Sequence, residues 1–166
     1  DNFINDPDCN RLIYDPEGGL SASRQLFTMD IETSEVVQIT NTDCFFVNGQ
    51  AVDSTTVMAN AICADTNEDG KINEQDNPNL YLIDLATEDM DCLTCDLGLR
   101  AINNPDYSPI NGQIVFSAQK ASIFHNYLFT LDANENLTQI TSDDDYMDFD
   151  CAWSEDASLI AFNRLP

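Results

Sequence analysis

Short runs of alternating apolar and polar residues recur along the chain and predict β-strands. The segment 106–117 combines an aromatic residue, a turn of Ser, Pro, Asn and Gly, and an alternating apolar run. Segment 153–162 repeats this pattern directly, segment 3–14 repeats it with a longer turn, and segment 46–58 is the most divergent copy. An alternating apolar run beside a turn of this composition is typical of a β-hairpin. The pattern therefore predicts four hairpins.

A second pair of strands is predicted after three of the four copies. The segments 26–40, 80–94 and 128–141 each begin with Leu followed by an aromatic residue, reach Asp three residues later, and end in Thr. The spacing from this Asp to the final Thr is 10, 10 and 9 residues, and turn-forming residues lie between them. This arrangement again predicts two strands joined by a short loop. The full repeat consequently has four strands.

The spacing of the copies predicts the architecture. Their leading aromatic residues stand at positions 3, 46, 107 and 153, so the intervals are 43, 61 and 46 residues, and the long interval contains an insert of about 18 residues between Ala61 and Asn79. Four strands in about 43 residues is typical of one β-propeller blade. Helical solenoids are excluded because no segment shows sustained helical periodicity. A β-sandwich of unrelated strands would leave the matched hairpins unexplained.

We therefore predict an all-β fold, a β-propeller of four-stranded antiparallel blades, with about three and a half blades in this chain. Blade 1 covers about residues 1–42, blade 2 about 43–98 with an insert at 64–79, blade 3 about 99–145, and half of blade 4 about 146–166. An unfinished propeller exposes strand edges. Either further chain or a strand from another chain is expected to complete the sheet.

The repeat resembles a known family. The segments 107–116, 127–132 and 137–141 resemble the TolB-type repeat of the WD-type β-propeller superfamily, in which a Trp-Ser-Pro-Asp-Gly turn precedes strands that end in Asp and in Leu-Thr. The resemblance covers nearly the whole chain, with departures at 44–46 and 154–156. It implies a propeller ring of about six blades and a role in protein interaction, without implying a particular partner.

Composition narrows the function. The chain has 166 residues, of which 43% are hydrophobic, and 30 Asp and Glu against six Lys and Arg leave a formal charge of −24. This charge repels phosphate and anionic lipid, so nucleic acid and membrane insertion are excluded as modes of binding. No apolar stretch is long enough for a transmembrane helix, and the chain begins at Asp1 without a signal-type segment. We expect a soluble mature chain, or a fragment of a longer one.

Six cysteines in a chain with one histidine favour disulfides and an extracellular or periplasmic location over zinc sites. Cys44 opens the first strand of blade 2 and Cys63 closes the second, so the two are expected within bonding reach. The pair Cys92 and Cys95 predicts a local disulfide, whereas redox activity would require a helix start that the sequence lacks. Cys9 and Cys151 are expected at opposite rims of the propeller, and their pairing stays open.

The insert carries a calcium-binding motif at 65–76. Oxygen-bearing side chains fall at positions 1, 3, 5, 9 and 12 of the loop, Gly70 stands at position 6, and an apolar Ile at position 8. This spacing matches the EF-hand loop, and Asp rather than Glu at position 12 resembles the dockerin type. The predicted Ca²⁺ ligands are Asp65, Asn67, Asp69, the carbonyl of Lys71, Asn73 and Asp76. Because helices do not flank the loop, the ion is expected to stabilise the fold rather than signal.

Two further polar features are weaker indications of a functional site. The acidic run 142–150 contains five Asp residues besides Ser142, Tyr146, Met147 and Phe149, and it predicts a solvated connection or a second Ca²⁺ site. Asn136 begins an Asn-Leu-Thr sequon, a glycosylation site only in an organism that glycosylates.

The sequence does not indicate an enzyme. It lacks a nucleophile elbow, a metalloprotease motif and a phosphate loop, and its single histidine, His125, is expected to be a polar surface residue. We therefore expect a non-catalytic secreted propeller that binds proteins, including copies of itself, and such edge-to-edge contacts can extend into filaments. The alternative is the propeller domain of a larger secreted hydrolase or peptidase.

Overall fold

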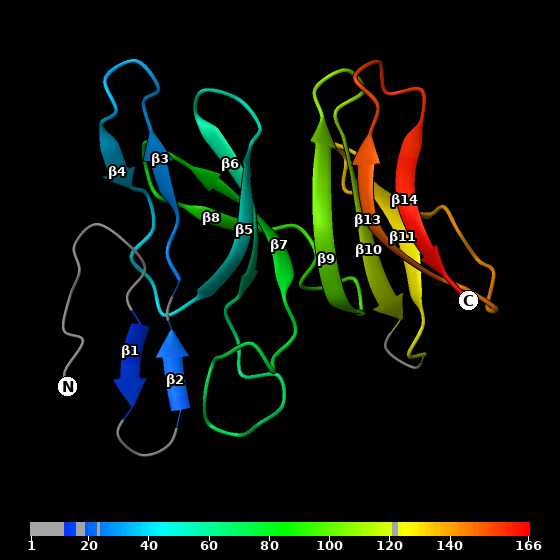
Figure 1. Cartoon of the computed structure of the whole chain (residues 1–166), viewed down its shortest axis with the longest axis horizontal. Coiled ribbons are helices and arrows are strands. Elements are labelled where there is room, and N and C mark those ends of the chain that lie inside the picture. The colour runs from blue at the N-terminus through cyan, green and yellow to red at the C-terminus, as the bar shows by residue number, and fades with distance from the viewer. Residues whose placement is uncertain (1–11, 16–18, 23, 121–122) are drawn as a thin grey trace.

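The computed structural model describes residues 12–15, 19–22, 24–120 and 123–166. All regular secondary structure in these residues is β-strand (Figure 1). The described part of the chain has no helix of the length and hydropathy that spanning a membrane requires. The strands are β1 (Leu12–Asp15), β2 (Gly19–Ala22), β3 (Phe27–Met29), β4 (Val36–Gln38), β5 (Phe45–Ala51), β6 (Thr56–Ile62), β7 (Asn79–Asp84), β8 (Met90–Cys92), β9 (Leu99–Ser108), β10 (Gln113–Lys120), β11 (Asn126–Leu131), β12 (Leu137–Gln139), β13 (Met147–Trp153) and β14 (Ile160–Leu165).

Two four-stranded antiparallel sheets form the middle of the molecule. Strands β5 to β8 make the first complete sheet and β9 to β12 the second, each in sequential order. The pairs β1–β2, β3–β4 and β13–β14 are separate two-stranded sheets, and we call the last two the N-terminal hairpin and the C-terminal hairpin. The prediction of an all-β fold with four-stranded antiparallel sheets is confirmed. No sheet closes on itself within the described residues, and the number of blades stays a prediction.

The hydrophobic core is formed by side chains that pack between neighbouring sheets. The largest cluster of buried side chains combines residues from both complete sheets: Met58, Leu80, Ile102, Ile114, Phe116, Ala118, Tyr127, Phe129 and Leu131. A second cluster, Val115, Leu128 and Cys151, joins the second complete sheet to the C-terminal hairpin. Strand β10 thus has buried side chains on both of its faces. A sheet covered on both faces needs nearly continuous apolar strands, which the sequence Ile-Val-Phe supplies here.

A hydrogen-bonded relay links the sheets at one position of the repeat. Gln50 of β5 accepts a hydrogen bond from the backbone N–H of Tyr107 at 2.8 Å and donates from Nε2 to the Oδ1 atom of Asp106 at 2.9 Å. Asp106, the residue of β9 that corresponds to Gln50, accepts from the backbone N–H of Trp153 at 2.7 Å. Each sheet therefore holds the next through a side chain at the same register position. In β13 that position is Ala152, which cannot extend the relay.

A threonine closes the second strand pair of each of three repeats within its own sheet. The hydroxyl oxygens of Thr40, Thr94 and Thr141 accept hydrogen bonds from the backbone N–H groups of Leu26, Leu80 and Leu128, at 2.9, 3.0 and 2.9 Å. The final Thr of the sequence pattern therefore closes each outer strand pair onto the start of the preceding strand.

The alignment of Phe46 with Tyr107 and Trp153 is wrong. Tyr107 and Trp153 lie at the ends of β9 and β13, just before the hairpin turns, whereas Phe46 lies at the start of β5. The residue before the corresponding turn is Ala51, which pairs with Val57 as Tyr107 pairs with Ile114. Phe46 is 2% exposed because its ring fills the core of the first complete sheet. Aligning this copy by its aromatic residue alone therefore gives the wrong register.

The first repeat also differs from the prediction. Its leading segment, with Phe3 and Cys9, lies outside the described residues. Strand β1 pairs with β2, from Leu12 opposite Ala22 to Asp15 opposite Gly19, and not with β3. Only three residues separate β1 from β2, so this local pairing closes a much shorter loop than a pairing with β3 would. The described residues of the first repeat thus do not form one four-stranded sheet.

Candidate functional site

The loop between β6 and β7 folds around the side chain of Asp76. This carboxylate is 4% exposed. Its Oδ1 atom accepts hydrogen bonds from the N–H groups of Thr66 and Asn67 at 2.7 and 3.1 Å, and its Oδ2 atom accepts from the N–H of Asn73 at 3.0 Å. Burial alone would raise the pKa of Asp76, but these hydrogen bonds outweigh burial and hold the pKa below its usual value. Position 12 of the motif therefore ties both ends of the loop together as an ionised carboxylate.

The beginning of the loop is curled by side-chain oxygens that accept backbone hydrogen bonds. Asp65 accepts from the N–H groups of Asp69 and Gly70, at 3.1 and 2.7 Å. Asn67 accepts from Asp69 at 2.9 Å, and Asp69 accepts from Lys71 at 2.9 Å. Gly70 has a φ of +85°, a left-handed conformation that favours glycine. The turn at position 6 of the motif thus explains the glycine found there.

The donor chemistry of this loop suits a hard cation. Three carboxylates, two side-chain amides and one backbone carbonyl make an all-oxygen set, which Ca²⁺ prefers. Asp76 is buried, Asp65 and Asn73 are half-buried, and the other predicted ligands, Asn67, Asp69 and Lys71, are exposed. Across the described residues, three or more His, Cys, Asp or Glu side chains nowhere gather closely enough to hold a metal ion. Calcium binding by these six residues therefore stays a prediction.

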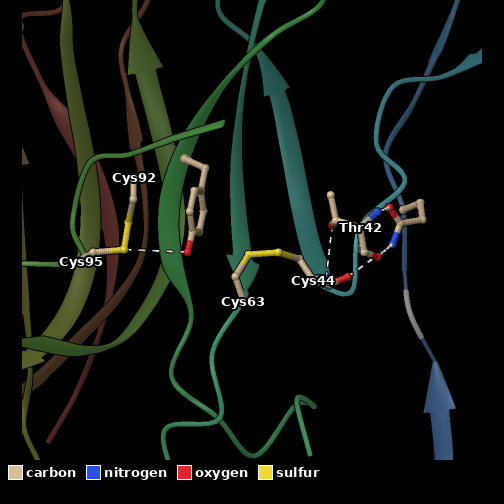
Figure 2. Close-up of a disulfide and its surroundings, with 7 residues drawn as sticks. Thr42, Cys44, Cys63, Cys92 and Cys95 are labelled. Atoms are coloured by element: carbon tan, nitrogen blue, oxygen red, sulfur yellow. Dashed lines mark hydrogen bonds between the residues drawn. A yellow bond between two sulfur atoms is a disulfide. The ribbon is translucent and has the colours of Figure 1, made fainter. Parts of the chain in front are cut away.

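Two disulfides stabilise the first complete sheet. Cys44 is bonded to Cys63, joining the start of β5 to the end of β6, as their strand positions predict. Cys92 is bonded to Cys95 directly after β8, and the hydroxyl of Tyr81 lies 3.8 Å from the Cys95 sulfur (Figure 2). The prediction of disulfides is confirmed for both pairs. The second pair lies at the end of β8 and in the turn that follows it, as the sequence predicts, and not at the start of a helix.

The C-terminal hairpin has an open strand edge. Strand β14 pairs with β13 and with no other strand in the described part of the chain. Phe162 and Leu165 on this strand are 39% and 52% exposed, and Leu159 just before it is 70% exposed. Unpaired backbone groups beside exposed apolar side chains make an edge that can accept another strand.

The N-terminal hairpin has a second open edge. Within the described residues β3 pairs only with β4. Its exposed apolar side chains are Phe27, Met29, Val36 and Val37, and Ile31 lies in the turn between the strands. Figure 1 shows this hairpin and the C-terminal hairpin at opposite ends of the molecule. Sequence analysis predicted open edges from the unfinished repeat but did not identify these side chains.

The acidic run is divided between a solvated turn and an ion pair in which the carboxylate is buried and the guanidinium is exposed. Residues 143–145 are exposed, although Asp144 accepts a hydrogen bond from the hydroxyl of Tyr127 at 2.5 Å. Asp148 is 1% exposed and is bound by Arg164 of β14 through two hydrogen bonds of 2.7 and 2.9 Å. Arg164 lowers the pKa of the Asp148 carboxyl, outweighing the opposite effect of burial. At Asp148 the counterion is therefore an arginine, and a second Ca²⁺ site stays a prediction.

The remaining candidate residues are dispersed. His125 is half-buried rather than a surface residue, because its ring lies against Tyr127 at 5.6 Å between centroids. Asn136 is exposed in the turn between β11 and β12 and donates to Asp132, so the sequon is accessible. Cys151 is a free, buried thiol whose pKa burial raises to about 12. Cys9 lies outside the described residues, and the expectation for it stays a prediction.

These features define the class: an all-β protein of antiparallel four-stranded sheets with open outer hairpins. Its fold is TolB-like. The chain matches TolB from Acinetobacter baumannii with a TM-score of 0.59 and 18% sequence identity, over 86% of this chain and 32% of that one. It matches the putative TolB from Agrobacterium tumefaciens with a TM-score of 0.61 and 13% identity, over 89% of this chain and 52% of that one.

This chain therefore spans about a third and about half of the two structures it matches. No protein-family model matches the sequence, and no curated protein matches it either. At these identities the likeness concerns the fold alone.

Proposed function

We propose that this protein is a non-catalytic, secreted interaction module that binds proteins, including copies of itself, through its open strand edges. The observation that carries the proposal is β14, a strand with an apolar, unpaired edge. Strand addition to such an edge uses backbone hydrogen bonds for affinity and side-chain contacts for specificity. The two disulfides support an oxidising location, either extracellular or periplasmic.

Calcium has a structural role in this proposal. The ion binds the loop through the side chains of Asp65, Asn67, Asp69, Asn73 and Asp76 and the carbonyl of Lys71, and neutralises part of a charge of −24. The loop directly joins β6 to β7, two neighbouring strands of the first complete sheet. Ion binding therefore stabilises the sheet that supports the N-terminal hairpin.

The first experiment measures the molar mass of the chain by light scattering, in calcium and then in chelator, together with the melting temperature. Assemblies larger than the 18.5 kDa chain in calcium support the self-association. At a calcium concentration of about 100 times Kd, removal of the ion costs about 2.7 kcal/mol. For a chain of this length we expect the melting temperature to fall by about 5–10 °C.

The variant Asp65→Ala provides the matched test of the ion. We expect its melting temperature to be independent of calcium, whereas the exposed-turn variant Asp53→Ala should respond as the unmodified chain does. An unchanged melting temperature of the unmodified chain in chelator would contradict the calcium role. A monomer in both conditions that also binds no other protein would contradict the interaction role.

A further inference from the structure

The two outer hairpins correspond to complementary halves of the repeat. In the C-terminal hairpin Trp153 pairs with Ile160, as Tyr107 pairs with Ile114 in the second complete sheet. Strand β14 therefore corresponds to β10, the second strand of the repeat, and Phe162 corresponds to Phe116. In the complete sheet β10 has a neighbour on each side, whereas among the described residues β14 has a neighbour on one side only, β13.

The N-terminal hairpin supplies the third and fourth strands. The segment Leu26 to Asp30 repeats Leu128 to Asp132, and the same threonine contact closes both units. Strand β3 thus corresponds to β11, and Phe27 corresponds to Phe129. Like β14, β3 has an unpaired edge on the side where the complete sheet continues.

The complete sheet shows what these halves would form together. Phe116 of β10 pairs directly with Phe129 of β11, and their rings stack with centroids 6.0 Å apart. The two rings are 0% and 2% exposed there. In the separate hairpins, the corresponding Phe162 and Phe27 are each 39% exposed. Each hairpin consequently presents one half of a stacked aromatic pair.

We propose that β14 of one copy pairs antiparallel with β3 of a second copy, with Phe162 opposite Phe27, and completes a four-stranded sheet in the order β13-β14-β3-β4. The register of β10 with β11 places Ala161 opposite Thr28 and Ile160 opposite Met29. This inference rests on the proposed function, because it names the partner of the same open edge.

A second copy fits this edge because it carries the complementary half, whereas the two described hairpins of one copy lie too far apart to pair with each other. The hairpins lie at opposite ends of the molecule, with both complete sheets between them (Figure 1).

Electrostatics favours the same pairing of β14 with β3 of a second copy. Although the chain has 30 Asp and Glu residues, β3, β4 and β14 contain no carboxylate, and Arg164 is the one charged residue among these strands. The paired edges therefore avoid the repulsion that most of the surface would produce.

The shared sheet would also continue contacts already present. The C-terminal hairpin packs on the second complete sheet through Cys151, Val115 and Leu128. The start of the N-terminal hairpin packs on the first complete sheet, where Leu26 contacts the cluster around Phe46. A shared sheet would lie between the second complete sheet of one copy and the first complete sheet of the next. This contact is head-to-tail, so it can link successive copies.

Site-specific cross-linking tests the register. The variants Ala161→Cys and Thr28→Cys are purified separately, mixed in calcium and oxidised mildly, and the joined peptides are identified by mass spectrometry. Facing residues of paired strands lie within disulfide reach, so we expect a dimer with one copy of each variant, joined through positions 161 and 28. The matched control replaces Thr28→Cys by Thr33→Cys, in the turn beyond β3, which should not cross-link.

A charge introduced at the shared sheet tests the same contact without cysteine chemistry. Phe162→Glu places a carboxylate opposite Phe27, and we expect it to weaken self-association, measured by light scattering, about tenfold or more. Ile110→Glu adds the same charge in the exposed turn between β9 and β10, outside both hairpins, and should leave association nearly unchanged. Circular dichroism of both variants establishes that each is folded.

The outcomes separate this inference from the proposed function. If assemblies form but the 161–28 cross-link is absent and Phe162→Glu associates as the unmodified chain does, the named pairing is overturned and interaction through other edges stands. If the chain is monomeric and binds no other protein, both proposals fail. Cross-linking at 161 and 28 together with loss of assembly in Phe162→Glu supports the pairing.

Discussion

Strands β10 and β14 carry the same repeat but differ in their surroundings. Ile114 and Phe116 of β10 correspond to Ile160 and Phe162 of β14, yet Phe116 is 0% exposed and Phe162 is 39% exposed. The difference comes from the neighbours, because β10 lies between β9 and β11, whereas β13 is the one strand that pairs with β14 in the described part of the chain. The apolar pattern of a strand therefore shows which side chains can be buried, and its neighbouring strands decide whether those side chains are buried.

The sequence of the C-terminal hairpin is partly adapted to exposure. Where β10 has Ala118, β14 has Arg164, whose guanidinium binds the buried carboxylate of Asp148 on β13. The guanidinium also lies over the ring of Phe162, 5.4 Å from its centroid. The arginine therefore stabilises the hairpin from within by polar contacts that β10 does not need.

The largest expected difference between β10 and β14 is in the free energy of unfolding that is lost when their phenylalanine is replaced by alanine. We expect Phe116→Ala to lower the free energy of unfolding by about 3–5 kcal/mol, because it leaves a cavity in the core and removes a stacked pair. Phe162→Ala should cost less than about 1 kcal/mol in the monomer, because its ring is partly solvated. Urea unfolding at a concentration where the chain is monomeric measures both values. Equal costs would contradict the comparison.

A smaller effect is expected from the relay that attaches the C-terminal hairpin. Asp106→Ala removes the acceptor of the Trp153 N–H and the partner of the Gln50 amide, at a cost of about 1–3 kcal/mol. Hydrogen exchange should show faster exchange in β13 and β14 than in β10 and β11. The exposed variant Glu155→Ala is the control and should change stability by less than about 0.5 kcal/mol. Uniform loss of protection in all four strands would show that the relay does not act on this hairpin.

The subtlest test uses the thiol between the two regions and changes no residue. Burial raises the pKa of Cys151 to about 12, so at pH 8 its reactive thiolate is about a thousandfold scarcer than in an ordinary cysteine. We expect alkylation of Cys151 in the folded chain to be slower than in urea by at least that factor, followed by peptide mass spectrometry. Rapid alkylation of the folded chain would mean that the C-terminal hairpin separates readily from the second complete sheet.

Much of the fold follows from local sequence. The Asp-to-Thr spacing correctly predicted the outer strand pairs, because Asp30, Asp84 and Asp132 accept hydrogen bonds within their turns and the final Thr closes the unit. The disulfide of Cys44 with Cys63 was likewise predictable, since the ends of adjacent antiparallel strands meet at one edge. The calcium motif was recognised from spacing, although the structure adds that Asp76 is buried and ties the loop together.

Contacts between the sheets could not be predicted in the same way. Gln50 and Asp106 are distant in sequence, and neither belongs to a recognisable motif. Their hydrogen bond depends on how the sheets stack. Phe46 was placed in the wrong register because an aromatic residue fits both a turn flank and a core. The pairing of β1 with β2 depended on which partner strand is close in space.

Local sequence was enough to predict most strands, the repeat spacing, the oxygen-rich loop and the two disulfides, because turns, alternation and short loops act over a few residues. Which described copies of the repeat form a complete sheet follows from the three-dimensional arrangement, because burial and strand pairing depend on neighbours that are distant in the chain. Phe27 and Phe162 remain exposed for that reason, although their sequence positions match those of a buried aromatic pair.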